Sequence, residues 1–451
     1  MAVNGTGGPA RLEPRDHGFM RAFSSLRVYN YRLYWTGQLI SLTGTWMQRL
    51  AQAWLVLNLT NSPFALGTVI TLQFLPLSIL SLFGGVLADR IPKRRLLITT
   101  QSIAAIQALI LAFLTSAGLI QLWHVYVLAL MLGLTNAFDN PARQSFPVEL
   151  VGRDEVANAV ALNFTLMNAS RIAGPSLAGI AIATIGLAGC FWLNAVSFLG
   201  TICALIAMKP DLFFSVPARP HGRTLSLLRD GVVYARHTPA VFVLLIQLLF
   251  FGTFAYNFNV VLPLLAKFTL HTSSLGYGFL FAALGAGSLV AALTLAYTRM
   301  QSQRTVVLGG LALVVALIGL GLSHQYVISL VLLALTGGCS IMYSASTQTR
   351  LQVIVPDALR GRTMSLYTQF QAGTTPIGSL FIGGVSERWN PGIALVTAGG
   401  LSAIGLVLAG LYVRGRSPHD MVRGTVLDPG FEGGLPMAVV LPLGGGSVAR
   451  N

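Results

Sequence analysis

Residues 84–95 have the sequence Gly-Gly-Val-Leu-Ala-Asp-Arg-Ile-Pro-Lys-Arg-Arg, a short basic connection between two long apolar stretches. Those stretches, at roughly 66–88 and 96–118, are each long enough to cross the hydrocarbon core of a membrane, which takes about 20 residues. Cations gathered beside such a stretch are typical of a loop on the cytoplasmic surface. We therefore predict two membrane helices joined by a short cytoplasmic loop.

The whole chain has the composition of a membrane protein. Of its 451 residues, 54% are hydrophobic and 10% are charged, against about 25% charged in a typical soluble domain. So few charges cannot cover a soluble globule of this length. Twelve apolar segments follow one another, at roughly 35–57, 66–88, 96–118, 122–140, 156–183, 187–208, 239–266, 274–298, 304–323, 325–347, 363–385 and 391–413.

The formal charge of +15 does not indicate binding to nucleic acid, because of where the cations lie. Most of them occur in the N-terminal arm, in the C-terminal tail and in every second connection between apolar segments. This alternation is the positive-inside pattern of membrane proteins. It predicts a multi-pass protein of the cell membrane, embedded in the lipid bilayer, with both termini in the cytoplasm.

The longest internal connection divides the chain into two halves. We expect a cytoplasmic arm (1–33), a six-helix half (34–208), a cytoplasmic linker (209–238), a second six-helix half (239–413) and a disordered tail (414–451). An interfacial helix is expected in the linker, where one helical face carries Leu225, Leu228, Val232 and Ala235. Residues 168–175 and 369–376 are similar to each other, which suggests paired halves, as in many transporters.

The loop at 84–95 resembles the signature loop of the major facilitator superfamily, although Pro92 stands where the family pattern has its second glycine. The resemblance implies an all-α integral membrane fold, with twelve transmembrane helices in two pseudo-symmetric six-helix halves. Gly85 is expected to allow close helix approach. Asp89 and Lys93 are expected to form a cytoplasmic latch with Asp139, and the full latch set is Gly85, Asp89, Arg90, Lys93, Asp139 and Arg143.

A second resemblance lies in the fifth apolar segment. Residues 170–179, Ser-Arg-Ile-Ala-Gly-Pro-Ser-Leu-Ala-Gly, are similar to the glycine-proline motif of exporters in the superfamily. Gly174, Pro175 and Gly179 are the expected helix-packing residues, because glycine and proline weaken a helix and admit a close neighbour. We expect Gly174 and Pro175 to pack against Gly285 and Gly287 in the eighth segment.

Three further stretches, 44–54, 139–147 and 228–231, resemble the branch of the superfamily that contains an enterobactin exporter and multidrug efflux proteins. This implies a monomeric secondary exporter of a small amphiphilic molecule (a siderophore, drug or metabolite), driven by proton exchange. An importer of the same fold and a non-transporting membrane sensor remain the alternatives. The sequence contains no catalytic constellation, no nucleotide-binding motif and no metal-like spacing, so we expect neither an enzyme nor a cofactor.

Several apolar segments carry one polar face each, and polar faces in lipid must meet each other or water. Either simple hydrogen bonding between helices or a shared central cavity explains them. The residues expected to line such a cavity are Gln38, Thr45, Arg49, Gln52, Asn168, Arg171, Phe254, Asn257, Ser340, Tyr343 and Gln371.

Arg49 and Arg171 are the two cations inside apolar segments, where an unpaired guanidinium costs at least about 2.5 to 3.5 kcal/mol. Each has a structural explanation, in which the guanidinium binds backbone carbonyls or reaches the membrane–water interface. In the functional explanation both face the cavity and attract an anionic or polar cargo. Proton coupling follows from the resemblance alone, since Asp139 is the one acid near a segment interior and it sits beside Arg143.

Overall fold

The computed structural model describes residues 23–214, 224–298 and 302–414 and is helical throughout these ranges, without a strand. The expected N-terminal arm, up to residue 22, and the tail from 415 onward lie outside the described residues. Eight of the described helices are long and apolar enough to cross a membrane, and one of them spans Leu122–Ala207. With this helix counted as three passes the eight give ten, and α2 (Tyr29–Thr60) and the broken pair α12–α13 (357–388) complete the twelve passes of the predicted all-α membrane architecture.

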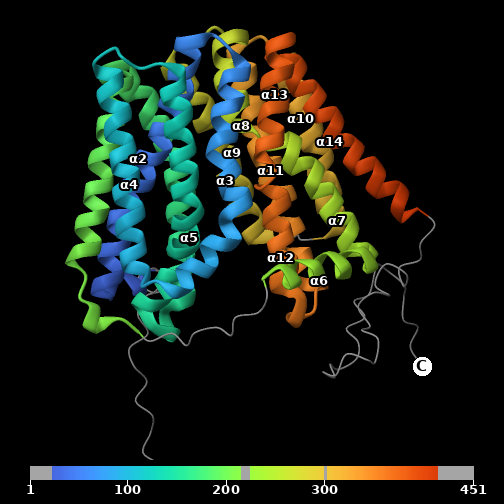
Figure 1. The fold of residues 1–451 in the computed structure, drawn as a ribbon. Coiled ribbons are helices and arrows are strands. Elements are labelled where there is room, and N and C mark those ends of the chain that lie inside the picture. Colours follow the sequence, from blue (N-terminus) through green and yellow to red (C-terminus); the bar gives the residue numbers. More distant parts are fainter. Residues whose placement is uncertain (1–22, 215–223, 299–301, 415–451) are drawn as a thin grey trace, which may run out of the picture.

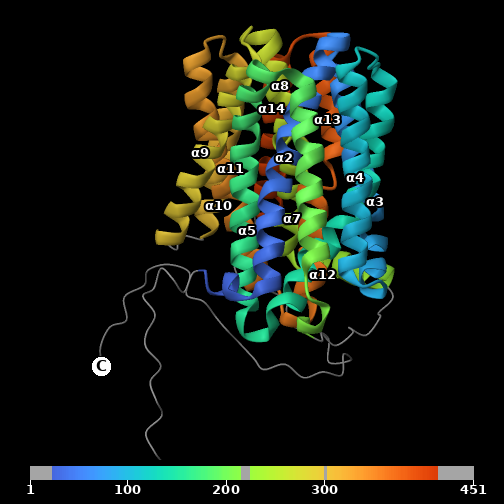
Figure 2. The ribbon, with the colours of Figure 1, turned by 90° about the vertical axis from the view of Figure 1, so that its left-hand side faces the viewer.

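The N-terminal half contains η1 (Ser24–Arg27), α2 (Tyr29–Thr60), α3 (Pro63–Arg90), α4 (Lys93–Ser116) and the long α5 (Leu122–Ala207). Two glycines in α5 have left-handed backbone angles, Gly152 with φ 73° and Gly186 with φ 75°. A side chain is disfavoured at such angles, and the chain turns there. They divide α5 into its three passes, and α2 lies between two of these passes in Figure 2.

The C-terminal half follows the short η2 (Pro210–Leu212) and α6 (Thr224–His237), the helix found within the expected linker. The side chains of residues 224–230 lie outside the described set, so of the expected interfacial face only Val232, which is exposed, and Ala235, which is buried, are described. The remaining elements are α7 (Pro239–Phe250), η3 (Phe251–Ala255), α8 (Phe258–Leu264), η4 (Leu265–Thr269), α9 (Ser274–Thr298), α10 (Gln303–Leu322), α11 (Tyr326–Ile354), α12 (Asp357–Gln371), α13 (Thr375–Arg388) and α14 (Pro391–Val413).

Two predicted segments are interrupted by irregular backbone. The seventh segment contains two π-helical turns, η3 and η4, and leaves the helical conformation at Asn257. The eleventh segment is split into α12 and α13 at residues 372–374. Irregular backbone inside a membrane is tolerated where it is buried in protein or lines a cavity. Both interruptions therefore point to the space between the halves.

The two ends of the bundle differ in charge (Figure 1). The lower end in that view carries α6 and the connections α3–α4 and α11–α12, which adjoin Arg90 and Arg360, and we call it the basic end. The other end carries the connections α2–α3, α4–α5 and α13–α14, and we call it the opposite end. The halves meet mainly where α3 packs on α13 and α5 packs on α9.

Candidate functional site

A cavity of about 470 Å³ lies between the two halves. Its wall is built from α2, α3, α4, α5, α8, α9, α11 and the α12–α13 break, so both halves contribute. It reaches Asp139 and Arg143 on the first pass of α5, toward the basic end, whereas the residues of the opposite rim do not line it. A wall with polar groups inside an apolar frame is typical of a small-molecule site.

Six of the eleven residues expected to face a cavity line this one. They are Thr45, Arg49, Asn168, Arg171, Ser340 and Gln371. Both arginines are among them, at mid-depth of the bundle. The polar faces of α2, of the middle pass of α5 and of α11 therefore converge on one space.

The other five expected residues do not line the cavity, because each is engaged within its own half. Gln38 is fully buried and accepts a hydrogen bond from Arg143, and Gln52 accepts one from Gln73 at 3.2 Å. Phe254 packs on Phe381, with ring centres 5.2 Å apart.

The last two of the five lie in the C-terminal half. Asn257 donates to the carbonyl oxygen of Thr253 at 2.6 Å, and Tyr343 stacks on Phe251 with centroids 4.3 Å apart. A polar helix face in this fold is wider than the cavity. The residues at its edges pack against neighbouring helices or form hydrogen bonds, in line with the simpler of the two explanations, hydrogen bonding between helices.

Trp46 stands beside both arginines, and sequence reasoning missed it. The guanidinium carbon of Arg49 lies 4.7 Å from the centre of the Trp46 ring, and that of Arg171 lies 5.7 Å from it. The Arg49 carbon is also 5.7 Å from the ring centre of Phe74. Cation–π contacts of this kind offset part of the cost of placing a guanidinium away from water.

Neither arginine has an ion pair with a carboxylate among the described side chains. The Nε atom of Arg49 is buried and has no hydrogen-bond partner in that set. A buried donor left in this way is costly unless water or a ligand reaches it. The middle of the cavity is therefore an electropositive region with unused hydrogen-bonding capacity.

The one carboxylate among the described lining residues is already engaged. Asp139 is 2% exposed, and its Oδ2 accepts from Arg143 Nε at 2.7 Å. Its Oδ1 accepts from Thr100 Oγ1 at 2.7 Å and from Gln101 Nε2 at 2.9 Å. Since Arg143 balances this charge, Asp139 does not neutralise Arg49 or Arg171.

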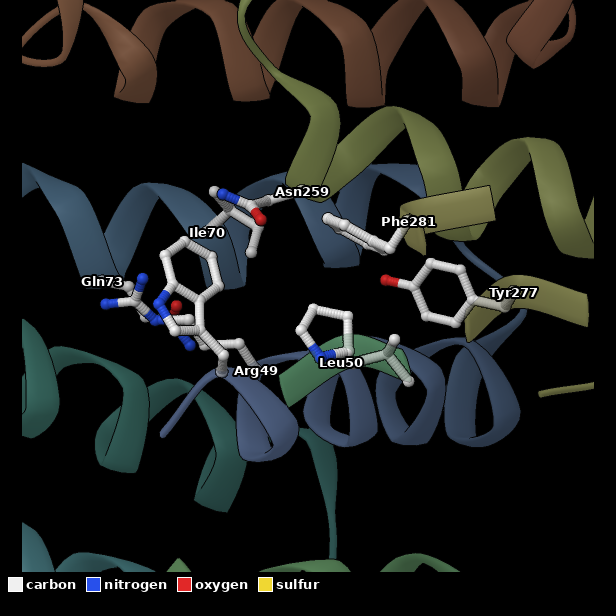
Figure 3. A pocket seen from close by; sticks show the side chains of 9 residues that line it. Arg49, Leu50, Ile70, Gln73, Asn259, Tyr277 and Phe281 are labelled. Atoms are coloured by element: carbon white, nitrogen blue, oxygen red, sulfur yellow. The ribbon is translucent and has the colours of Figure 1, made fainter. Parts of the chain in front are cut away.

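A small extension of the site lies beside Arg49 (Figure 3). It has a volume of about 10 Å³, room for about one water molecule. In Figure 3, Asn259 and Phe281 lie across this pocket from Arg49 and Leu50, and the Tyr277 hydroxyl points inward. Its wall shares Arg49 and Asn259 with the large cavity, so the two spaces adjoin.

The loop residues at the basic end pair differently from the expected latch. Lys93 forms an ion pair with Glu149 on α5, not with Asp139. The side chain of Asp89 lies outside the described residues, and Arg90 is exposed. Glu149 was missed because it is 56 residues from Lys93 in sequence.

The close contact between α3 and α5 that was expected at Gly85 occurs instead at the adjacent Gly84. A Cβ atom on Gly84 would lie 2.1 Å from the carbonyl oxygen of Ala137, whereas one on Gly85 would meet nothing within 4 Å. Adjacent helical residues point about 100° apart, so only one of the two can face α5. The expected role of Gly85 is corrected to Gly84.

The glycine-proline motif packs against two different helices. A Cβ atom on Gly174 would lie 2.5 Å from that of Trp46 on α2, so Gly174 faces α2 and not α9 as expected. Gly179 meets Gly278 on α9, and the carbonyl oxygen of Pro175 faces the same glycine.

Of the two glycines expected opposite the motif, Gly285 does meet it, at Ile172. Gly287 instead meets Ala334 on α11. The motif nevertheless joins the halves, and Gly174 also sets the position of Trp46, because the two residues are in direct contact.

Comparison with known proteins places this geometry in a family. Residues 20–421 match the family model described as transmembrane secretion effector. The enterobactin exporter EntS of Citrobacter koseri is 26% identical over 392 residues, covering 85% of this chain and 90% of that protein. EntS of Escherichia coli is 26% identical over 388 residues, with the same coverages.

Solved transporter structures share the fold at low sequence identity. The nucleoside transporter NupG superposes with a TM-score of 0.66 at 14% identity, covering 87% of this chain and all of that chain. A bacterial homologue of the lysosomal transporter Spinster, in an inward-facing and unoccupied conformation, gives 0.61 at 14% identity, covering 88% and 94%. A POT family transporter in complex with 5-aminolevulinic acid gives 0.67 at 11% identity, covering 85% and 96%.

Proposed function

From the premise that the chain belongs to the transmembrane secretion effector family of the major facilitator superfamily, we propose that it is a secondary active exporter. It moves a small amphiphilic molecule out of the cytoplasm by alternating access, in exchange for protons and as a monomer. The match to enterobactin exporters over 85% of the chain supports the direction. The cargo of those relatives is not carried over to this chain.

The basic end is the cytoplasmic end in this proposal, with both termini on that side. The positive-inside pattern supports this orientation, because loop cations are retained in the cytoplasm. The cavity extends toward Asp139 and Arg143 near this end. The structure then corresponds to the state that takes up cargo from the cytoplasm.

One observation carries the choice of cargo. Arg49 and Arg171 both face the cavity, both lie beside Trp46, and the described carboxylate of the wall is already paired with Arg143. A guanidinium in a low-dielectric cavity attracts anions strongly and repels cations. The cargo is accordingly an anionic or neutral polar amphiphile whose apolar part packs on Trp46, Phe74 and Phe281.

At the basic end we propose a conformational latch around the signature loop. Its members are the residues of the sequence analysis other than Gly85, namely Asp89, Arg90, Lys93, Asp139 and Arg143. The ion pair of Lys93 with Glu149 and the contact of Gly84 with Ala137 support a role of this loop in holding α3, α4 and α5 together. They add Gly84 and Glu149 to the set.

Proteoliposomes with an imposed pH gradient test the function. Two fluorescent probes that share a xanthene ring system serve as cargo, the anion carboxyfluorescein and the cation rhodamine 123. We expect transport of the anion that depends on the gradient, with weaker transport of the cation. Absence of transport for either probe in both gradient directions would favour the sensor, and accumulation on the cytoplasmic side would favour the importer.

A further inference from the structure

At the opposite end of the bundle, two charged side chains from the C-terminal half bind the ends of two N-terminal-half helices. Lys267 in η4 donates from Nζ to the carbonyl oxygen of Leu57 at 2.6 Å and to Asn58 Oδ1 at 3.3 Å. Glu387 near the end of α13 accepts at Oε2 from Ser62 Oγ at 2.9 Å and from the backbone N–H of Phe64 at 3.1 Å.

Each charge lies at the helix end of opposite sign. Leu57 is in the last turn of α2, which ends at Thr60, and Phe64 is in the first turn of α3, which begins at Pro63. The last carbonyls of a helix carry partial negative charge and the first N–H groups carry partial positive charge. A lysine on the α2 end and a glutamate on the α3 end therefore both stabilise contact between the halves.

The bonds of Glu387 lie at the rim of a close-packed seam between α3 and α13. A Cβ atom on Gly67 would lie 2.5 Å from the carbonyl oxygen of Ser379 and 3.3 Å from the Cα of Gly383. Deeper along the same seam, Thr71 Oγ1 donates to the carbonyl oxygen of Pro376 at 3.1 Å. Opening of the bundle at this end must break the Lys267 and Glu387 bonds, because each joins one half to the other.

We propose that Lys267 and Glu387 are positioning residues that hold the transporter closed at the opposite end. We call them, with Leu57, Asn58, Ser62 and Phe64, the outer clasp. The clasp favours the conformation that is open toward the basic end, and its release accompanies opening to the other side. This inference rests on the alternating access of the proposed function and requires nothing of the cargo.

The clasp is connected to the cargo cavity through one short segment. Tyr256, Phe258 and Asn259 line the cavity, and Lys267 follows them after α8, within the π-helical turn η4. The backbone leaves the helical conformation at Asn257, on the other side of α8. A cargo that displaces α8 therefore also moves the lysine that binds the end of α2.

Spin labels across the opposite end test the clasp on the full-length protein without cargo. Leu119 and Val327 are 59% and 70% exposed and belong to different halves, so Leu119→Cys and Val327→Cys accept labels with little disturbance. The native cysteines are first replaced. Distances between the labels are then measured by pulsed electron paramagnetic resonance in nanodiscs, in the parent and in Lys267→Met and Glu387→Gln variants.

Each variant should raise the population with the long label distance, relative to the population with the short one, by about two- to fivefold. This range corresponds to the interaction energy of one charge with a helix end. The double variant should shift it further, and Lys267→Arg should restore the parent distribution because it retains the cation. Ser62→Ala, which removes one bond to Glu387 but no charge, should give a smaller shift. Arg388→Gln is the matched control, since it removes an exposed charge next to Glu387 without removing a clasp bond.

An unchanged distance distribution in the double variant would overturn the clasp, as would an equal shift in the Arg388→Gln control. Misfolding as the cause of a shift is excluded when Lys267→Arg and the control elute as the parent does in size-exclusion chromatography. If Lys267→Met fails to fold, Glu387→Gln and Ser62→Ala decide the question. Failure of export in vesicles, with the distances shifted as expected, would count against the proposed function and leave the clasp standing.

Discussion

The guanidinium carbon of Arg49 lies 4.7 Å from the centre of the Trp46 ring, within one turn of the same helix. Because Arg171 approaches the same ring from α5, the indole is common to both cations of the cavity. It holds them in place without neutralising them. A ligand anion can therefore still interact with either charge.

Replacement of Trp46 by leucine should weaken binding of an anionic probe about tenfold. The cause is loss of two cation–π contacts, each worth about 0.5 to 2 kcal/mol, and of the aromatic surface beside them. Carboxyfluorescein binding to purified protein, measured by fluorescence anisotropy, gives the dissociation constant. Trp46→Phe keeps a ring and should lose less, and equal losses in both variants would contradict the role of the ring.

Replacement of Arg49 or of Arg171 by glutamine should reduce the preference for the anion over the cation. Glutamine keeps hydrogen-bonding capacity but removes the charge, so the ratio of carboxyfluorescein to rhodamine 123 transport should fall several-fold in each variant. Exposed Arg414 offers the comparison variant Arg414→Gln. Unaltered affinity and unaltered charge preference in both cavity variants would return the two arginines to a structural role.

Removal of the Asp139 charge should destabilise the protein, because it leaves Arg143 buried without its carboxylate. Breaking one side of a buried pair costs about 3 to 5 kcal/mol. Asp139→Asn should therefore lower the melting temperature in detergent, and the double variant Asp139→Asn with Arg143→Gln should recover part of the loss.

The same two variants test proton exchange through Asp139. If the carboxylate carries the proton, the double variant should bind carboxyfluorescein but no longer respond to an imposed pH gradient. Gradient-driven transport at the parent rate in the double variant would remove Asp139 from the coupling mechanism.

Substitutions at the two adjacent glycines of the signature loop should differ sharply. Gly84→Ala places a methyl group against the Ala137 carbonyl and should reduce transport and stability, whereas Gly85→Ala enters open space and should be tolerated. Transport at matched membrane expression measures the difference. Equal behaviour of the two alanine variants would show that the α3–α5 contact is not limiting.

The pairing of Lys93 with Glu149 should appear as an interaction in a double-mutant cycle. Lys93→Gln and Glu149→Gln should each lower the melting temperature, and their effects should be less than additive because both remove the same ion pair. Full additivity would mean that the pair contributes nothing beyond its separate residues. Lys93→Gln combined with Asp139→Asn serves as the comparison cycle.

The sequence by itself determined the class of fold. The length of the apolar segments, the alternation of loop cations and the glycine-containing signature loop are local features. In a lipid bilayer they can be interpreted directly, because the backbone inside the bilayer must be helical and loop cations are retained in the cytoplasm. Six cavity residues, Arg49 and Arg171 among them, were also accessible from the polar positions within the apolar segments. The two arginines could be assigned to the cavity from the sequence because an arginine inside a membrane segment needs a polar environment.

Only the tertiary structure decided which edge of each polar face meets the cavity. Thr45 lines it, while Gln38 and Gln52 of the same helix bind Arg143 and Gln73 within the N-terminal half. The partners of Lys93 and Lys267 were equally beyond the sequence, since Glu149 and Leu57 are 56 and 210 residues away. Periodicity fixes only the direction of a side chain from its own helix axis. The neighbour it meets depends on how twelve helices rotate and pack together, and on which end of the bundle the two halves are closed.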